Sequence, residues 1–200
     1  MSKKLIDLTM LINDKTPSWP EAKKQEIKQI STVKQTGFNV KSLSFESHFG
    51  THIDAPFHIL NNGKKLEDFS LETFFGSAIV IPLDSFEKYA KKIKKNDIVL
   101  LYTGQSKKAF DKDYFENTPL VSIGVAQKLV KKKVKIVGID SSSMDNAPYK
   151  IHNLILSNNI LIIENLANLD KLVGKRLELI VLPLKLDNAD GAPCRVIAKL

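Results

Sequence analysis

With 200 residues, 43% of them hydrophobic and 26% charged, the chain has the composition of one globular domain spanning residues 1–200, and not that of a disordered protein. No apolar run approaches the roughly 20 residues that cross a bilayer, and Met1-Ser-Lys-Lys precedes no signal-peptide core, so we expect no membrane association and no secretion. The net charge of +8 comes almost wholly from lysine. Because the runs Lys91–Lys95 and Lys131–Lys135 lack arginine and interleaved aromatic residues, they favour solvated helix faces over nucleic-acid binding. A single cysteine, Cys194, excludes an internal disulfide and fits a reducing cytoplasm.

Hydrophobic periodicity and turn residues predict many short strands and a few helices. Strands are expected at Leu5–Leu11, Lys24–Gln35, Lys41–Glu46, Ser77–Leu83, Asp97–Thr103, Val134–Ile139, Ile160–Glu164, Arg176–Leu184 and Pro193–Ala198. Helices are expected at Ser70–Phe75, Ser85–Lys95, Ser122–Lys132 and Ile151–Ser157, with a polar loop at residues 105–120. The segment Lys41–Glu46 alternates as a half-buried strand does. Strand–helix–strand units at 77–103 and 98–139 indicate a mixed α/β domain rather than a sandwich.

Three of the four histidines, His48, His52 and His58, lie within one stretch that also holds Asp54. Imidazole and carboxylate groups are the ligands that zinc and related ions take. A straight strand would separate the first histidine from the aspartate by about 20 Å, and the composition disfavours a regular helix. We therefore predict a bent loop in which Gly50 supplies the unusual backbone dihedrals. The alternative is a loop whose polar residues have no shared function.

The fourth histidine, His152, precedes a buried strand that ends in Glu164. A carboxylate at the end of an apolar run is costly unless it is paired or binds a cation. If both side chains reach the 48–58 segment, the site suits one or two divalent ions. Otherwise Glu164 points to water or caps a backbone group.

The segment His48-x-Gly-Thr-His-x-Asp-x-Pro-x-His58 resembles the signature of the metal-dependent cyclase family, whose best-known member is bacterial kynurenine formamidase (arylformamidase). The resemblance continues in order along nearly the whole chain. It includes Asp7-Leu-Thr9, Thr16-Pro-Ser-Trp-Pro20, Asp97–Gly104, Gly138-Ile-Asp-Ser141, Ile163-Glu-Asn-Leu166, Leu182-Pro-Leu184 and Asp190–Arg195. It implies a single mixed α/β domain with a swivelling β/β/α arrangement, a mixed sheet and flanking helices.

The resemblance also implies a metal site. His48, His52 and Asp54 would bind a first ion, Asp54 would bridge to a second ion held by His152, and Glu164 would contact both. The expected cofactor is zinc, with manganese as the alternative, at one or two ions per subunit. The family resemblance further implies a homodimer or homotetramer.

The implied reaction is hydrolysis of a C–N amide bond by a metal-activated water, with His58 as the acid/base and Trp19 lining the substrate pocket. An aryl formamide such as N-formylkynurenine is the expected small-molecule substrate, and Phe57 could stack on its ring or simply pack in the loop. Ser142 stands where relatives often carry proline. This departure weakens the inference of the family's substrate more than the inference of its metal site.

Three alternatives stay open. The first is a family hydrolase of another cyclic or linear amide, such as an isatin-like compound. The second is a catalytically silent metal-binding module. The third is a serine hydrolase using one of Ser141–Ser143, which the lack of a G-x-S-x-G elbow disfavours. Cys194 is expected to be a small buried residue rather than a nucleophile, and Arg195 a structural ion-pair partner.

Overall fold

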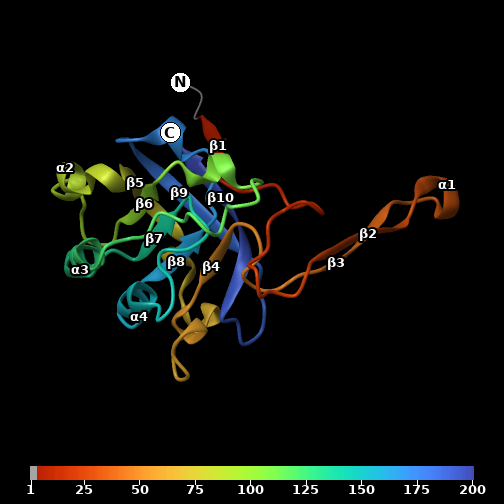
Figure 1. The fold of residues 1–200 in the computed structure, drawn as a ribbon, viewed down its shortest axis with the longest axis horizontal. Helices are drawn as coiled ribbons and strands as arrows, with labels where there is room; N and C mark the ends of the chain where they lie inside the picture. The colour runs from red at the N-terminus through yellow and green to blue at the C-terminus, as the bar shows by residue number, and fades with distance from the viewer. Residues whose placement is uncertain (1–3) are drawn as a thin grey trace.

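A closed β-sheet with helices on one side forms the body of the molecule. The computed structural model describes residues 4–200 (Figure 1), so part of the N-terminal segment discussed above, residues 1–3, lies outside the described residues. The sheet comprises β1 (Leu5–Asp7), β4 (His52–Asp54), β5 (Phe75–Pro82), β6 (Ile98–Tyr102), β7 (Ile136–Ile139), β8 (Leu161–Glu164), β9 (Arg176–Pro183) and β10 (Gly191–Lys199). The flanking helices are α2 (Phe86–Ala90), α3 (Ile123–Lys132) and α4 (Lys150–Leu156).

The strand order is β1-β10-β4-β8-β7-β6-β5-β9, and β9 also pairs with β10. Seven strands therefore close into a ring, and β1 lies outside it on the edge of β10. Strands β5 to β8 run parallel to their neighbours in that series, whereas β4, β9 and β10 pair antiparallel. The prediction of a mixed α/β fold with a mixed sheet and flanking helices is confirmed.

The parallel strands are apolar on both faces because each face meets a different core. In β5, Val80 points into the ring and Ile79 packs against the helical layer. In β6, Leu100 and Val99 divide in the same way. Continuous apolar runs are typical of such doubly covered parallel strands. Helix α3 completes the outer core, and the Ser122 side chain caps its N-terminus.

Strand β4 brings the expected site residues together. It lies between β8 and β10, and its register places His52 opposite Glu164 on one side and opposite Pro193 on the other. Side chains two residues apart on a strand share a face, so Asp54 points the same way as His52. Residues more than a hundred positions apart in the chain thus meet at one end of the ring.

A long hairpin arm projects from this body (Figure 1). It consists of β2 (Glu26–Ser31), α1 (Val33–Thr36) and β3 (Val40–Ser44). Strands β2 and β3 pair only with each other among the described strands, and every residue of β3 is exposed. The expected half-buried strand is therefore wrong, because no element of residues 4–200 covers the alternating face.

Other expected elements differ mainly in length. The helix expected to end at Lys95 ends at Ala90, and the first strand ends at Asp7 rather than Leu11. The expected polar loop at 105–120 contains a 3-10 turn and the almost fully buried Tyr114. Within the described chain, no helix is both long enough and apolar enough to cross a membrane.

Candidate metal centre

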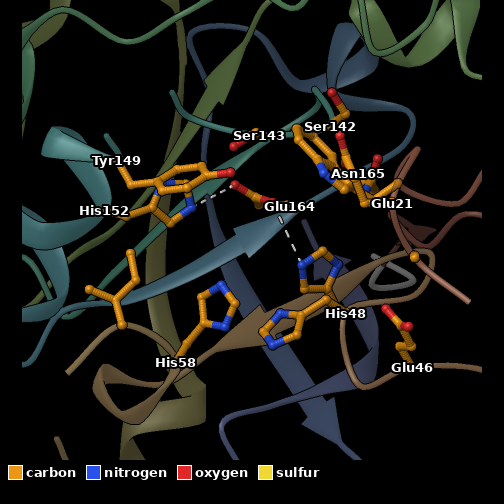
Figure 2. A pocket seen from close by; sticks show the side chains of 14 residues that line it. Glu21, Glu46, His48, His58, Ser142, Ser143, Tyr149, His152, Glu164 and Asn165 are labelled. Atoms are coloured by element: carbon orange, nitrogen blue, oxygen red, sulfur yellow. Dashed lines mark hydrogen bonds and ion pairs between the residues drawn. The ribbon is translucent and has the colours of Figure 1, made fainter. Parts of the chain in front are cut away.

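All four histidines line one cavity of about 440 Å³. Figure 2 shows His48 and His58 on one wall of the cavity, with His152 and Glu164 across from them. Asp54, which is 1% exposed at the end of β4, lies 2.8 Å from His48 and 4.0 Å from His152. The structure thus brings together every residue that the sequence pointed to as a metal ligand, together with the expected acid/base.

The first ligand group surrounds one oxygen of Asp54. Its Oδ1 atom lies 2.8 Å from His48 Nδ1 and 3.3 Å from His52 Nε2. Ligand atoms from the three residues all fall within 4.8 Å of one another. This spacing suits a single small cation whose ligands lie near 2 Å from it.

The second ligand group uses the other oxygen of Asp54. Its Oδ2 atom lies 4.0 Å from His152 Nε2, which in turn lies 3.1 Å from Glu164 Oε1. The other Glu164 oxygen, Oε2, lies 3.6 Å from His52 Nε2. Asp54 and Glu164 therefore both stand between the two groups, as two neighbouring ions would require.

The 48–58 segment is not one loop, as expected, but a turn, a three-residue strand and a 3-10 turn. Gly50 adopts a φ of 64°, which lets the chain reverse between His48 and β4. Pro56 then opens the 3-10 turn Pro56–His58, and the His58 N–H donates to the Ala55 carbonyl at 2.9 Å. These two bends bring the ligand side chains closer together than a straight strand would allow.

Each ligand histidine is anchored through the ring nitrogen that faces away from the other ligands. His48 Nε2 bonds Asp190 Oδ2 at 2.9 Å, and His52 Nδ1 donates to the Gly50 carbonyl at 2.9 Å. His152 Nδ1 bonds Asp145 Oδ1. Such outer contacts fix the tautomer and orientation of metal-ligating histidines. The donor set and its anchoring therefore fit a divalent ion.

The electrostatics of the cluster also fit cation binding. Burial works to lower the pKa of His48, but its hydrogen bonds to Asp190 and Asp54 raise it to about 10. Burial opposes ionisation of Asp54, yet the charges of His52 and His48 hold its pKa well below the usual range. Both shifts favour a negatively charged Asp54 in the interior, which suits a cation ligand, and metal binding at His48 would compete with the proton that its carboxylate partners favour.

His58 differs from the other three histidines. No hydrogen bond to its ring is present within residues 4–200, and its Nδ1 atom lies 3.8 Å from Asp190 Oδ2. Its ring centroid is 3.9 Å from that of His48. Burial lowers the pKa of His58, and His48 and His152 lower it further against the opposing charge of Asp54. A neutral imidazole with unanchored nitrogens is suited to proton transfer.

The backbone at Gly191 leaves no space for a side chain. A Cβ atom there would lie 2.6 Å from His48 Cε1 and 2.9 Å from the Ile53 carbonyl oxygen. We expect Gly191→Ala to displace the His48 ring and to weaken zinc affinity by about 10–100-fold, as loss of an outer contact does. The control is Gly124→Ala, since the nearest atom to a Cβ there is 4.0 Å away. Unchanged zinc affinity in Gly191→Ala, measured by chelator competition, would show that His48 does not bind the ion.

Asp145 anchors His152 and also accepts the backbone N–H of Ile151. Asp145→Ala should lower zinc affinity by roughly 10–100-fold, and Asp145→Asn by less, because an amide oxygen can still accept from the imidazole. Competition with a chromogenic chelator measures both variants. Equal zinc affinities in Asp145→Ala and the parent chain would show that Asp145 does not support metal binding by His152.

Of the two aromatic residues expected near the substrate, one lines the cavity and the other does not. Trp19 lines the cavity and packs edge-on against Phe115. Phe57 does not line it, and its ring instead lies under the Lys65 ammonium group. Ser141 and Ser143 donate to carbonyls of their own loop.

Neither Cys194 nor Arg195 belongs to the site. Cys194 is buried, and burial raises the pKa of its thiol, which disfavours the nucleophilic thiolate. Arg195 forms a two-bond ion pair with Asp7 at 3.0 and 2.8 Å. Both findings match the structural roles expected from the sequence.

Three polar residues at the site were not singled out from the sequence. Asp190 and Asn165 lie within segments that carried the family resemblance, and Asn165 directly follows Glu164, which received a role. Asp145 follows the serine run without a distinguishing pattern. Their importance depends on which ring nitrogen or cavity wall they face, and that geometry has no signature in a single sequence.

Comparison with known proteins agrees with the geometry. Residues 6–146 match the family described as "Putative cyclase". The chain is 40% identical to an uncharacterized protein of Methanocaldococcus jannaschii, over 98% of this chain and 99% of that protein. It is 32% identical to the kynurenine formamidase of Bacillus mycoides, over 97% of this chain and 96% of the enzyme.

Two solved structures share the architecture. A potential metal-dependent hydrolase with cyclase activity superposes with a TM-score of 0.82 at 27% identity, covering 99% of this chain and 98% of that one. An isatin hydrolase bound to the product analogue thioisatinate gives 0.85 at 24% identity, covering 99% and 92%.

Proposed function

Because the chain belongs to the putative cyclase family, we propose that it is a metal-dependent hydrolase that cleaves a C–N amide bond. The observation that carries the proposal is the contrast among the four histidines. Three are anchored as metal ligands are, and His58 is held in the same cavity with no anchoring hydrogen bond from residues 4–200. A purely structural metal site has no need of the fourth.

The proposed ligands are His48, His52, Asp54, His152 and Glu164, and the donor set admits one or two divalent ions. Zinc suits the mixture of imidazole and carboxylate groups, with manganese as the alternative. When bound, such an ion lowers the pKa of a water molecule to about 7.

The protein's own part in the reaction is orientation and proton transfer. Asp54 and Glu164 fix the positions of the histidine ligands around the reacting centre. His58 accepts a proton during attack on the amide carbonyl and returns it to the leaving nitrogen, which prevents expulsion of an unstable amide anion. The wall of the cavity that carries Trp19 offers an aromatic surface for the rest of the substrate.

For the substrate we propose an aryl formamide such as N-formylkynurenine. The similarity to a kynurenine formamidase over nearly the whole chain supports this choice. An anilide-type nitrogen also leaves more readily than an alkyl amine, so acid catalysis by a single imidazole suffices. The isatin hydrolases share the fold, which makes a cyclic aryl amide the second candidate.

Initial rates with N-formylkynurenine and with isatin separate the candidates when metal content is measured on the same preparation. Faster hydrolysis of N-formylkynurenine is the expected result. Faster hydrolysis of isatin would overturn the substrate and keep the reaction class. Bound metal without turnover of either compound or of simple anilides would indicate a silent binding module.

We also propose a homo-oligomer, a dimer or tetramer, in which the hairpin arm contacts a second copy of the chain. A two-stranded sheet alone is marginally stable in water, and the arm exposes Ile30 at 63% and Phe38 at 57%. The base of the arm borders the cavity through Ala22 and Glu46, so such a contact would form beside the site. Light scattering should give a multiple of the 22.4 kDa chain mass and a monomer for Ile30→Ser/Phe38→Ser. A wild-type monomer would contradict this proposal.

A further inference from the structure

Asn165 occupies a distinctive place on the cavity wall. It directly follows Glu164 at the end of β8, lines the cavity, and is 8% exposed (Figure 2). Its backbone has a φ of 57°, a left-handed conformation that asparagine tolerates better than most residues. The chain therefore turns at this residue immediately after a proposed metal ligand.

Almost every hydrogen-bonding group of Asn165 is already used within the protein. Its N–H donates to the Ser141 carbonyl at 2.9 Å, and its own carbonyl accepts the Thr51 hydroxyl at 2.6 Å. Its side-chain oxygen, Oδ1, accepts the Tyr114 hydroxyl at 2.7 Å. Only the side-chain NH₂ group has no hydrogen bond to residues 4–200.

That NH₂ group faces the cavity. Within the described part of the chain, every side-chain nitrogen or oxygen that is inaccessible to solvent, in a residue that is not exposed, has a hydrogen-bond partner. The Nδ2 atom is therefore accessible, and the accessible side of Asn165 is the cavity it lines. The Nδ2 donor can find a hydrogen-bond partner only in the cavity, so a bound ligand can supply that partner.

Tyr114 holds the amide in this orientation. The tyrosine is 1% exposed, and its carbonyl accepts the Gln105 side chain at 2.9 Å. Burial raises the pKa of Tyr114, and the charges of Asp140 and Glu164 raise it further. The phenol therefore stays protonated, and its O–H donates a hydrogen bond to Oδ1. This leaves the NH₂ end of the amide toward the cavity.

Other neutral donors on this wall are already engaged or less enclosed. Ser143 donates to the Asp145 carbonyl, and Ser142 is bonded to Thr118 at 2.7 Å. Tyr149 is 38% exposed. The four histidines and Glu164 are assigned to the metal and to proton transfer, and the other two carboxylates that line the cavity, Glu21 and Glu46, accept hydrogen bonds when ionised. The Trp19 indole is only half-buried, so the most enclosed neutral donor left for the oxygen of a substrate is the Asn165 amide.

We propose that Asn165 is a substrate-contacting residue whose NH₂ group donates a hydrogen bond to the carbonyl oxygen of the amide substrate, and that Tyr114 is the positioning residue that aims it. This inference rests on the proposed amide hydrolysis. A fixed donor aimed at an oxygen that gains negative charge stabilises the transition state more than the ground state, so its contribution falls mainly in kcat.

The kinetic test compares Asn165→Ala, Asn165→Asp and Tyr114→Phe in hydrolysis of formanilide. Both Asn165 variants should lose about 10²–10³-fold in kcat, the loss typical of a removed oxyanion donor, with metal content unchanged. The aspartate variant has nearly the same shape and can still accept from Tyr114, so it separates loss of the donor from loss of packing. Tyr114→Phe should lose less, about tenfold, because the amide stays in place but is free to turn. The control is Asn158→Ala, at an exposed position.

A binding readout makes the test independent of turnover. In ¹⁵N-labelled protein, the Asn165 NH₂ signals are those missing from Asn165→Asp, and acetanilide should shift them. If acetanilide shifts the Trp19 indole signal and not the Asn165 pair, or if both Asn165 variants keep wild-type kcat, the inference is wrong and the proposed function stands. If the wild type neither hydrolyses formanilide nor binds acetanilide, the proposed function fails and the inference with it.

Discussion

His58→Ala is expected to keep its metal and lose about 10²–10⁴-fold in kcat, the contribution typical of a general acid–base. The reason is the position of the ring, which shares the cavity with the ligand histidines but has no anchoring hydrogen bond within the described chain. Without it, the leaving nitrogen must depart unprotonated. Steady-state kinetics with metal analysis of the same samples measures both quantities.

Two further measurements make the assignment specific. Added imidazole should restore part of the activity of His58→Ala, because the vacated space lies open to the cavity. The lower-pH limb of the kcat profile, which reports the group that must be neutral to accept a proton, should disappear in the variant. A His58→Ala enzyme with full activity would show that another group transfers the proton.

Asp54→Ala is expected to lose both metal and turnover. Each oxygen of this carboxylate faces a different ligand group, His48 and His52 on one side and His152 on the other. Removal of the side chain therefore breaks both groups at once, whereas His52→Ala breaks one directly. Elemental analysis should find far less than one metal equivalent in Asp54→Ala.

Asp54→Asn serves as the shape control, because it keeps the volume of the side chain and removes the charge that the buried imidazoles balance. It should also fail to retain metal. Asp187→Ala, on an exposed loop, should behave as the parent chain does. A full metal complement in either Asp54 variant would remove Asp54 from the ligand set.

The sequence predicted the members of the site better than their arrangement. The clustering of His48, His52 and His58 around Asp54 marked them as candidates, because scarce metal-binding residue types rarely gather by chance, and the family resemblance supplied their expected roles. Their actual geometry depends on β4 pairing with β8, which sets His52 opposite Glu164. Strand pairing between residues more than a hundred positions apart is a property of the tertiary fold, and periodicity within one segment does not report it.

The arm and the outer contacts illustrate two other limits. Alternation along Lys41–Glu46 predicted a strand correctly and its burial wrongly, because alternation shows that two faces differ and not that one is covered. Asp145 and Asp190 act through the second nitrogen of His152 and of His48. Their role follows from side-chain direction, which becomes visible only in three dimensions.

Removal and return of the metal tests the central claim most directly. Purified wild-type protein should contain one or two equivalents of a divalent ion, lose hydrolysis of aryl formamides after exhaustive chelation, and regain it on addition of stoichiometric zinc or manganese. Full activity in protein shown by elemental analysis to be free of metal would contradict the account.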